Sequence, residues 1–131
     1  MIAGEVTVRG VRSPYLAAGD AAAREAVVFV HGNPGSREDF APLVERVGPF
    51  ARAVALDMPG YGAADRPARF PYTVEGYADH LDGALAALGI ARAHLVLHDF
   101  GGPWGLTWAA AHPEAFASAT LIDTGVLLQG S

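Results

Sequence analysis

The sequence contains no cysteine and no lysine. The absence of cysteine excludes a disulfide framework, a thiolate metal site and thiol redox chemistry. The five histidines are dispersed along the chain and show none of the short-spaced pairs that bind zinc, so we expect neither a metal nor a cofactor. All nine basic residues are arginine, and 14 acidic residues outnumber them, so we expect no nucleic-acid partner.

Long apolar segments are absent as well. No apolar run approaches the roughly 18 residues that a membrane-spanning helix needs, and residues 1–5 lack the basic and apolar regions of a signal peptide. We therefore expect a cytoplasmic protein with no membrane partner. The 131 residues are 51% hydrophobic and 18% charged, which is the composition of one globular domain with a sizeable core.

Apolar segments alternate with amphipathic ones along the whole chain. Near the amino terminus, residues 5–9 and 14–18 predict two strands that pair as a hairpin at the edge of a sheet. Four short, mostly apolar runs are typical of strands buried in a parallel sheet: residues 26–30, 53–56, 94–97 and 117–122.

Amphipathic segments between these strands predict helices. The first follows Asp39, its expected N-cap, and the second begins after Thr73 and ends at Gly89. A third helix stops at His112, because the residue before a proline disfavours the helical conformation. Strands separated by helices predict an α/β fold with an open, mostly parallel sheet of about six strands and helices on both faces.

Three loops follow buried strands, at residues 31–35, 57–62 and 98–102. The carboxyl ends of parallel strands meet at one edge of such a sheet, where ligands bind. The third loop places Asp99 at the sharp turn into a helix where other enzymes carry the serine of the GxSxG motif. Glycines 101 and 102 allow that helix to pass close behind the turn. A simpler interpretation is that Asp99 only caps the helix.

Together, His31-Gly32-Asn33-Pro34, the loop 57–62 and Leu97-His98-Asp99-Phe100-Gly101-Gly102 resemble the α/β-hydrolase family. The similarity is to the branch with an aspartate nucleophile, which includes haloalkane dehalogenases and epoxide hydrolases. The resemblance covers residues 1–131. We expect these residues to be the amino-terminal part of a single α/β-hydrolase domain, about half of such an enzyme. The resemblance implies a small-molecule substrate.

The resemblance also implies roles for individual residues. Asp99 would attack a saturated carbon and form an alkyl ester, which an activated water would hydrolyse. The backbone N–H groups of Asn33 and Phe100 would hold the oxyanion formed in that step. The Asn33 side chain would in addition be placed to donate to a leaving halide.

Two positions leave the substrate class open. Dehalogenases usually carry tryptophan after the nucleophile, and Phe100 lacks the indole N–H that binds halide. Epoxide hydrolases usually carry a small residue where this chain has Leu97, which instead fits the dehalogenase pattern. We interpret the loop 57–62 as structural and expect the side chain of His98 to point away from Asp99.

No histidine of this chain matches the catalytic histidine of the family, which lies beyond a cap domain. Asp123 ends the last predicted strand, where some dehalogenases carry the acidic member of the triad. We therefore expect a truncated α/β-hydrolase without a cap that is inactive alone. The alternative is a non-catalytic fragment or pseudoenzyme with a binding or structural role. A serine hydrolase is disfavoured, because none of Ser36, Ser118 and Ser131 occupies the turn.

The last predicted strand also suggests self-association. In the complete fold another strand would pair with residues 117–122, so here we expect an open backbone edge that a second copy can pair with. Nearby apolar residues would enlarge the contact, namely Leu121, Val126, Leu127 and Leu128.

Overall fold

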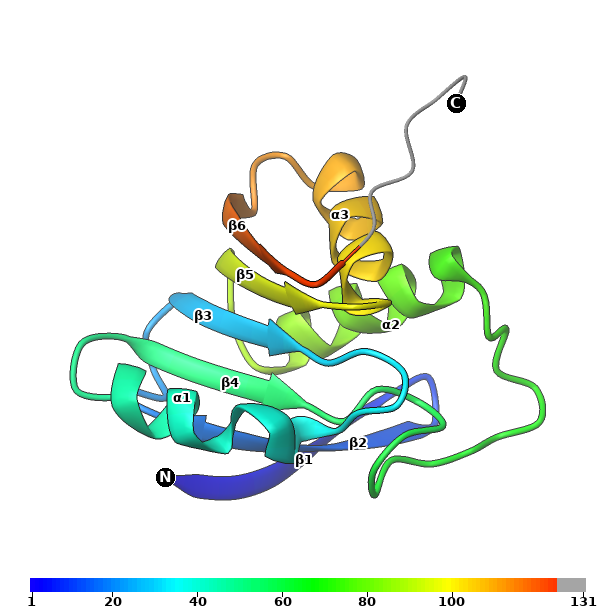
Figure 1. The fold of residues 1–131 in the computed structure, drawn as a ribbon, viewed down its shortest axis with the longest axis horizontal. Helices are drawn as coiled ribbons and strands as arrows, with labels where there is room; N and C mark the ends of the chain where they lie inside the picture. The colour runs from blue at the N-terminus through cyan, green and yellow to red at the C-terminus, as the bar shows by residue number, and fades with distance from the viewer. Residues whose placement is uncertain (125–131) are drawn as a thin grey trace.

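The computed structural model describes residues 1–124 (Figure 1). The apolar residues Val126, Leu127 and Leu128, expected to enlarge a self-association surface, lie outside this range. Within it, six strands form one sheet: β1 (Ile2–Val8), β2 (Val11–Ala18), β3 (Glu25–Val30), β4 (Arg52–Leu56), β5 (Arg92–His98) and β6 (Phe116–Ile122).

The strands lie in the order β1-β2-β4-β3-β5-β6. Strand β3 pairs in parallel with β4 and β5, and β5 pairs in parallel with β6. The hairpin β1–β2 adds to the edge of β4 in antiparallel orientation. The expected open, mostly parallel sheet with an edge hairpin is therefore confirmed.

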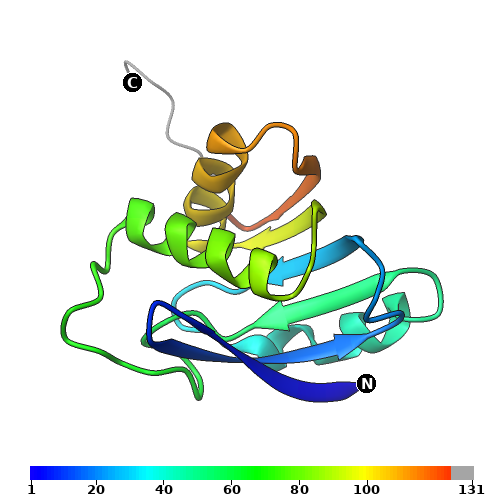
Figure 2. The same ribbon diagram turned by 180° about the vertical axis from the view of Figure 1, so that it is seen from behind.

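Helices cover both faces of the sheet, as expected. They are the 3-10 turn η1 (Arg37–Phe40) and the α-helices α1 (Ala41–Val47), α2 (Val74–Ala87) and α3 (Gly101–Ala111). Helix α1 lies in front of the sheet in Figure 1, whereas α2 and α3 lie in front of it in Figure 2. Val44 of α1 packs in a cluster with Phe29 and Ala55 on one face. Leu81 of α2 and Trp104 of α3 belong to the larger core on the other.

The first helical segment begins differently from the expectation. Asp39 is not its N-cap, because Ser36 caps the 3-10 turn that precedes α1. The Ser36 hydroxyl accepts from the N–H of Glu38, and the Asp39 carboxylate accepts from the N–H of Ser36 at 3.2 Å. This reciprocal arrangement satisfies amide groups that the helix leaves unpaired. At the second helix, Thr73 is the N-cap as predicted, accepting from the N–H of Gly76 at 3.0 Å.

Strands β3, β4 and β5 end at the same edge of the sheet, so the loops that follow them lie side by side (Figure 1). This confirms that the three loops singled out in the sequence meet in space. No helix within residues 1–124 is both long and apolar enough to cross a membrane.

Candidate functional site

The turn between β5 and α3 holds Asp99 in a strained conformation. Its φ of 53° lies in the left-handed region, which costs free energy for any residue with a Cβ. Backbone hydrogen bonds fix the turn, from the N–H of Asp99 to the oxygen of Ile122 at 3.4 Å and from the N–H of Gly102 to the oxygen of Asp99 at 3.0 Å. The Thr124 hydroxyl also donates to the oxygen of Asp99. The conformation is therefore held by both β6 and α3.

The carboxylate of Asp99 faces backbone N–H groups. Its Oδ2 accepts from the N–H of Asn33 at 2.9 Å. The pKa of Asp99 lies below its ordinary value, first because of the hydrogen bond from Asn33 and then because of one from the N–H of Phe100. Phe100 is the N-cap of α3, and no side chain caps that helix. The simpler interpretation of Asp99 as a helix cap is therefore excluded.

Two glycines allow the loops to approach this closely. A Cβ on Gly32 would lie 2.7 Å from Oδ2 of Asp99 and 2.8 Å from the oxygen of His98. A Cβ on Gly101 would lie 2.5 Å from the oxygen of Val30. The turn after β5 thus packs against the loop after β3 with no room for a side chain at either position.

The loop after β4 is anchored by a buried carboxylate, Asp57. Its Oδ1 accepts from the N–H of Arg37 at 2.7 Å, and its Oδ2 accepts from the N–H of Ala63 at 2.9 Å. The Arg37 guanidinium forms an ion pair with the same side chain. These contacts are consistent with the structural interpretation of this loop.

His31 joins the loop after β3 to the loop after β4. The N–H of Met58 donates to Nε2 of His31 at 3.0 Å, which leaves the proton on Nδ1 to donate to the oxygen of Gly32 at 2.9 Å. Burial lowers the pKa of the ring, which favours its neutral form. Both ring nitrogens are engaged, and this linking role was missed by the sequence analysis.

Among the remaining histidines, His98 directly precedes Asp99, and its electrostatic interaction is a minor cause of the lowered pKa of Asp99. The half-buried His98 follows the buried Leu97 in the alternation of β5, and the orientation of its side chain away from Asp99 stays a prediction. Within residues 1–124, no histidine is hydrogen-bonded to Asp99 or Asp123. Asp123 follows the end of β6 in the left-handed region, with φ 43°. Its predecessor contacts the Asp99 turn, so the structure brings Asp123 to the same end of the sheet.

An aromatic cluster borders the turn. The ring of Tyr61 lies 5.1 Å from that of His31 and 5.9 Å from that of Trp104, and Phe100 is half exposed beside Trp104. The pKa of Tyr61 is raised, first by burial and then by the negative charge of Asp99. Sequence reasoning assigned no functional group to this loop. The only signal for one was a tyrosine flanked by two turn glycines.

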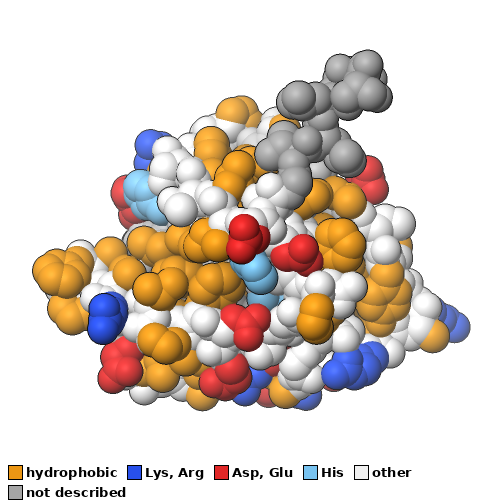
Figure 3. All heavy atoms as spheres, viewed as in Figure 1, with side chains coloured by type: hydrophobic (Ala, Val, Ile, Leu, Met, Phe, Trp, Pro, Cys, Tyr) orange, Lys and Arg blue, Asp and Glu red, His pale blue; other side chains and the backbone are white. Residues whose placement is uncertain are grey.

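The face of the molecule on the side of α1 is polar at its centre (Figure 3). Seen from the side of α1, acidic side chains and a histidine gather near the middle of the molecule, with hydrophobic side chains around them (Figure 3). An ionised carboxylate at a fixed turn, beside two backbone donors and aromatic rings, can act as a nucleophile or bind a small polar group.

Comparison with known proteins places this geometry in a family. The family model described as alpha/beta hydrolase fold matches residues 25–129. A haloalkane dehalogenase from Agrobacterium fabrum is 35% identical over 97 residues, which are 74% of this chain and 32% of that relative. A 2-hydroxymuconate semialdehyde hydrolase from a Pseudomonas species is 33% identical over 126 residues, 94% of this chain and 44% of that relative.

Solved structures agree with these matches. A haloalkane dehalogenase from Agrobacterium tumefaciens C58 superposes with a TM-score of 0.83 at 29% identity, covering 94% of this chain and 41% of its own. The chain thus spans about a third of the length of the dehalogenase relative and less than half of the others. It belongs to the α/β-hydrolase family, with haloalkane dehalogenases among its relatives.

Proposed function

We propose that Asp99 is the nucleophile of a hydrolase that cleaves the carbon–halogen bond of small organohalides, with epoxides as the second substrate class. The observation that carries this proposal is the Asp99 carboxylate, held at a strained turn and kept ionised by the N–H groups of Asn33 and Phe100. The relatives named as haloalkane dehalogenases support the organohalide class. An epoxide hydrolase structure at 20% identity supports only the fold.

The first half-reaction is a displacement at carbon. A lone pair of an Asp99 carboxylate oxygen forms a bond to the substrate carbon, and the carbon–halogen electron pair leaves with the halide. The product is an alkyl ester of Asp99. A fixed, ionised carboxylate favours this step, because the reacting oxygen needs no proton removal and little reorientation.

The second half-reaction hydrolyses the alkyl ester and regenerates the free Asp99 carboxylate. A water oxygen attacks the carbonyl carbon of the ester as a base takes one water proton, and the alcohol leaves with a proton as the carboxylate reforms. The oxyanion between these steps would accept hydrogen bonds from the N–H groups of Asn33 and Phe100. No histidine within residues 1–124 is hydrogen-bonded to Asp99, so the first half-reaction is the step to test on this chain.

Two further residues have proposed roles at this end of the sheet. Asp123 is the candidate acidic member of the triad, because it follows β6 directly beside the Asp99 turn. The hydroxyl of Tyr61 is a candidate donor to the leaving group. Its pKa is raised first by burial and then by the charge of Asp99, and its O–H would donate to the leaving halide the hydrogen bond that the Phe100 side chain cannot.

Intact-protein mass spectrometry after incubation with bromoalkanes and with epoxides tests the proposal. We expect one alkyl adduct per chain, mapped to Asp99 by peptide sequencing and absent from the Asp99→Ala variant. Asp20→Ala, which removes an exposed carboxylate outside the site, is the matched control and should leave the adduct in place. A folded chain that carries adducts only on other carboxylates, or none, would instead favour the non-catalytic alternative.

A further inference from the structure

A cavity of about 430 Å³ lies between the β1–β2 hairpin turn, the loop before α2 and the first turns of α2. Its volume is within the range of small-molecule sites. Asp99, Asn33 and Phe100 do not line it. It is therefore a second concave site, separate from the turn after β5.

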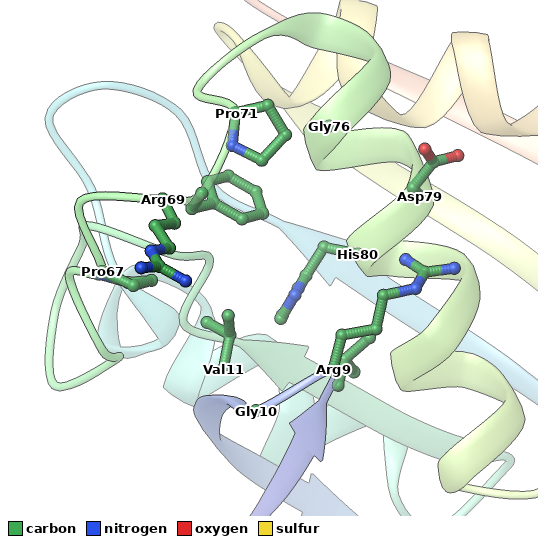
Figure 4. Close-up of a pocket in the computed structure, with 11 residues that line it drawn as sticks. Arg9, Gly10, Val11, Pro67, Arg69, Pro71, Gly76, Asp79 and His80 are labelled. Carbon is green, nitrogen blue, oxygen red and sulfur yellow. The ribbon is translucent and has the colours of Figure 1, made fainter.

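The inside of the cavity is apolar except for one histidine. Val8, Val11 and Phe70 provide its apolar lining. The side chain of His80 points into the cavity (Figure 4). His80 is only 2% exposed, and its Nε2 lies 2.7 Å from the hydroxyl of the buried Ser13. The other ring nitrogen has no hydrogen-bond partner among residues 1–124. This ring nitrogen thus remains available to a ligand in the cavity.

Two guanidinium groups flank the cavity on opposite sides (Figure 4). Arg9 comes from the hairpin turn and Arg69 from the loop before α2, and neither forms an ion pair or hydrogen bond with the described part of the chain. The carboxylate of Asp79 also lines the cavity, which leaves one net positive charge there. This is a local excess of positive charge in a chain whose net charge is −5.

We propose that this cavity binds a small amphipathic monoanion, an aromatic or aliphatic carboxylate. The apolar part of the ligand would lie against Val8, Val11 and Phe70, and its carboxylate would face Arg9 and Arg69. The single net charge of the lining favours a monoanion over a phosphate ester with two charges. The histidine supplies a donor at the inner end of the site once its free nitrogen carries the proton.

The hairpin turn fixes one of the two arginines. Arg9 and Gly10 have φ values of 49° and 80°, the pattern of a two-residue hairpin turn in which both central residues are left-handed. Asparagine is favoured at the position of Arg9 in such turns. Arg9→Asn therefore removes the charge while it preserves the turn, so a loss of binding in this variant reports on charge.

The test is a titration of the 131-residue chain with phenylacetate and with phenylacetamide, which has nearly the same size and no charge. Amide signals of Gly10 and Gly76, at two sides of the cavity, report on binding by NMR. One exposed ion pair raises affinity by up to about fivefold. With Arg9 and Arg69 both facing the ligand, we expect phenylacetate to bind about tenfold more tightly than phenylacetamide. Arg9→Asn and Arg69→Gln should each weaken phenylacetate about threefold and leave phenylacetamide unchanged.

Arg46→Gln is the matched control, because it removes the same charge from an exposed position on α1, away from the cavity. We expect the affinity for phenylacetate to be the same in Arg46→Gln, in Asp99→Asn and in the unmodified chain. Equal affinities for the acid and the amide, an equal loss in Arg46→Gln, or no saturable shift at Gly10 and Gly76 up to millimolar ligand would each overturn the proposal. Loss of binding in Asp99→Asn would place the ligand at the proposed catalytic turn instead.

Discussion

The backbone N–H of Asn33 lies 2.9 Å from Oδ2 of Asp99, although 66 positions separate the two residues in the sequence. The N–H groups of Asn33 and, second, of Phe100 are the main reasons why the pKa of this carboxylate is low. If Asp99 is alkylated as proposed, the same two groups face the carbonyl oxygen of the ester. They would then stabilise the negative charge that water attack places on that oxygen.

The low pKa of Asp99 predicts the pH dependence of the first half-reaction. A carboxylate whose folded-state pKa is lowered stays ionised below the ordinary range near 4, so alkylation should proceed at a constant rate from neutral pH down to roughly pH 4.5. The measurement is the rate of adduct formation by mass spectrometry across this range. A rate that already falls between pH 7 and pH 5 would mean that a different group titrates in the reacting species.

The buried ion pair predicts a large stability effect. Arg37→Met should lower the free energy of unfolding by about 3 kcal/mol, because it leaves the fully buried carboxylate of Asp57 without its counter-charge. Urea denaturation at neutral pH measures the change.

Arg12→Met is the comparison for this effect. Arg12 pairs with Glu5 at 2.9 Å and with Asp65 at 3.6 Å, but the three side chains are 40%, 57% and 41% exposed. Solvent screening weakens such a pair, so its loss should change the unfolding midpoint much less. Similar midpoints for the two variants would show that Asp57 is satisfied by its backbone donors alone.

His80 predicts a loss of stability in mild acid. Burial, and then the positive charge of Arg9, lowers its pKa from 6.5 to about 4. Below pH 6.5 the unfolded chain binds a proton that the folded chain does not, so stability is complete above that value and declines as the pH falls toward 4. The difference between the two pKa values of His80 corresponds to a loss of about 3 kcal/mol in the free energy of unfolding near pH 4.

His80→Gln isolates this contribution. Glutamine does not titrate and still offers a hydrogen-bonding group to Ser13. Unfolding curves at pH 7 and pH 4.5 should therefore differ more for the unmodified chain than for this variant. An identical difference in both would assign the acid sensitivity to other groups, with the buried His31 the first to examine.

The relative position of Asp99 and Asn33 was predictable from sequence because parallel strands end at one edge of a sheet. Local patterns fixed the strands, and their order then brought the following loops together. The contacts of Tyr61 and His31 were not predictable in this way, since they depend on how two glycine-rich loops fold over each other. The error at Asp39 was local, because both Ser36 and Asp39 fit the capping pattern and the sequence does not say which one starts the turn.

The cavity lined by His80 was even less predictable from the sequence. Its lining comes from a hairpin turn, an irregular loop and a helix, and no sequence pattern relates residue 9 to residues 69 and 80. The helix expected between Thr73 and Gly89 contains His80, and α2 confirms this helix. That the ring of His80 faces a cavity was not predictable, because it depends on the path of the loop before α2.

Strand β6 is the expected site of self-association. In the part of the chain that the structure describes, β6 pairs with β5 on one side only and forms an edge of the sheet. The strand contains no charged residue, and Leu121 and Ile122 are 44% and 38% exposed. The opposite edge, β1, carries Glu5, and charged side chains on an edge strand oppose pairing with a second copy. We therefore expect β6, rather than β1, to pair between copies.

Sedimentation velocity over a concentration series tests this preference with a matched pair of substitutions. Thr120→Lys places a charge on β6, and Thr7→Lys places the same charge at an exposed position of β1. Thr120→Lys should raise the concentration at which dimers form by about fivefold, which corresponds to roughly 1 kcal/mol, whereas Thr7→Lys should leave it unchanged. Equal effects of the two variants would point to net charge as the cause. A monomer at every concentration would mean that the edge of β6 is not available for pairing in solution.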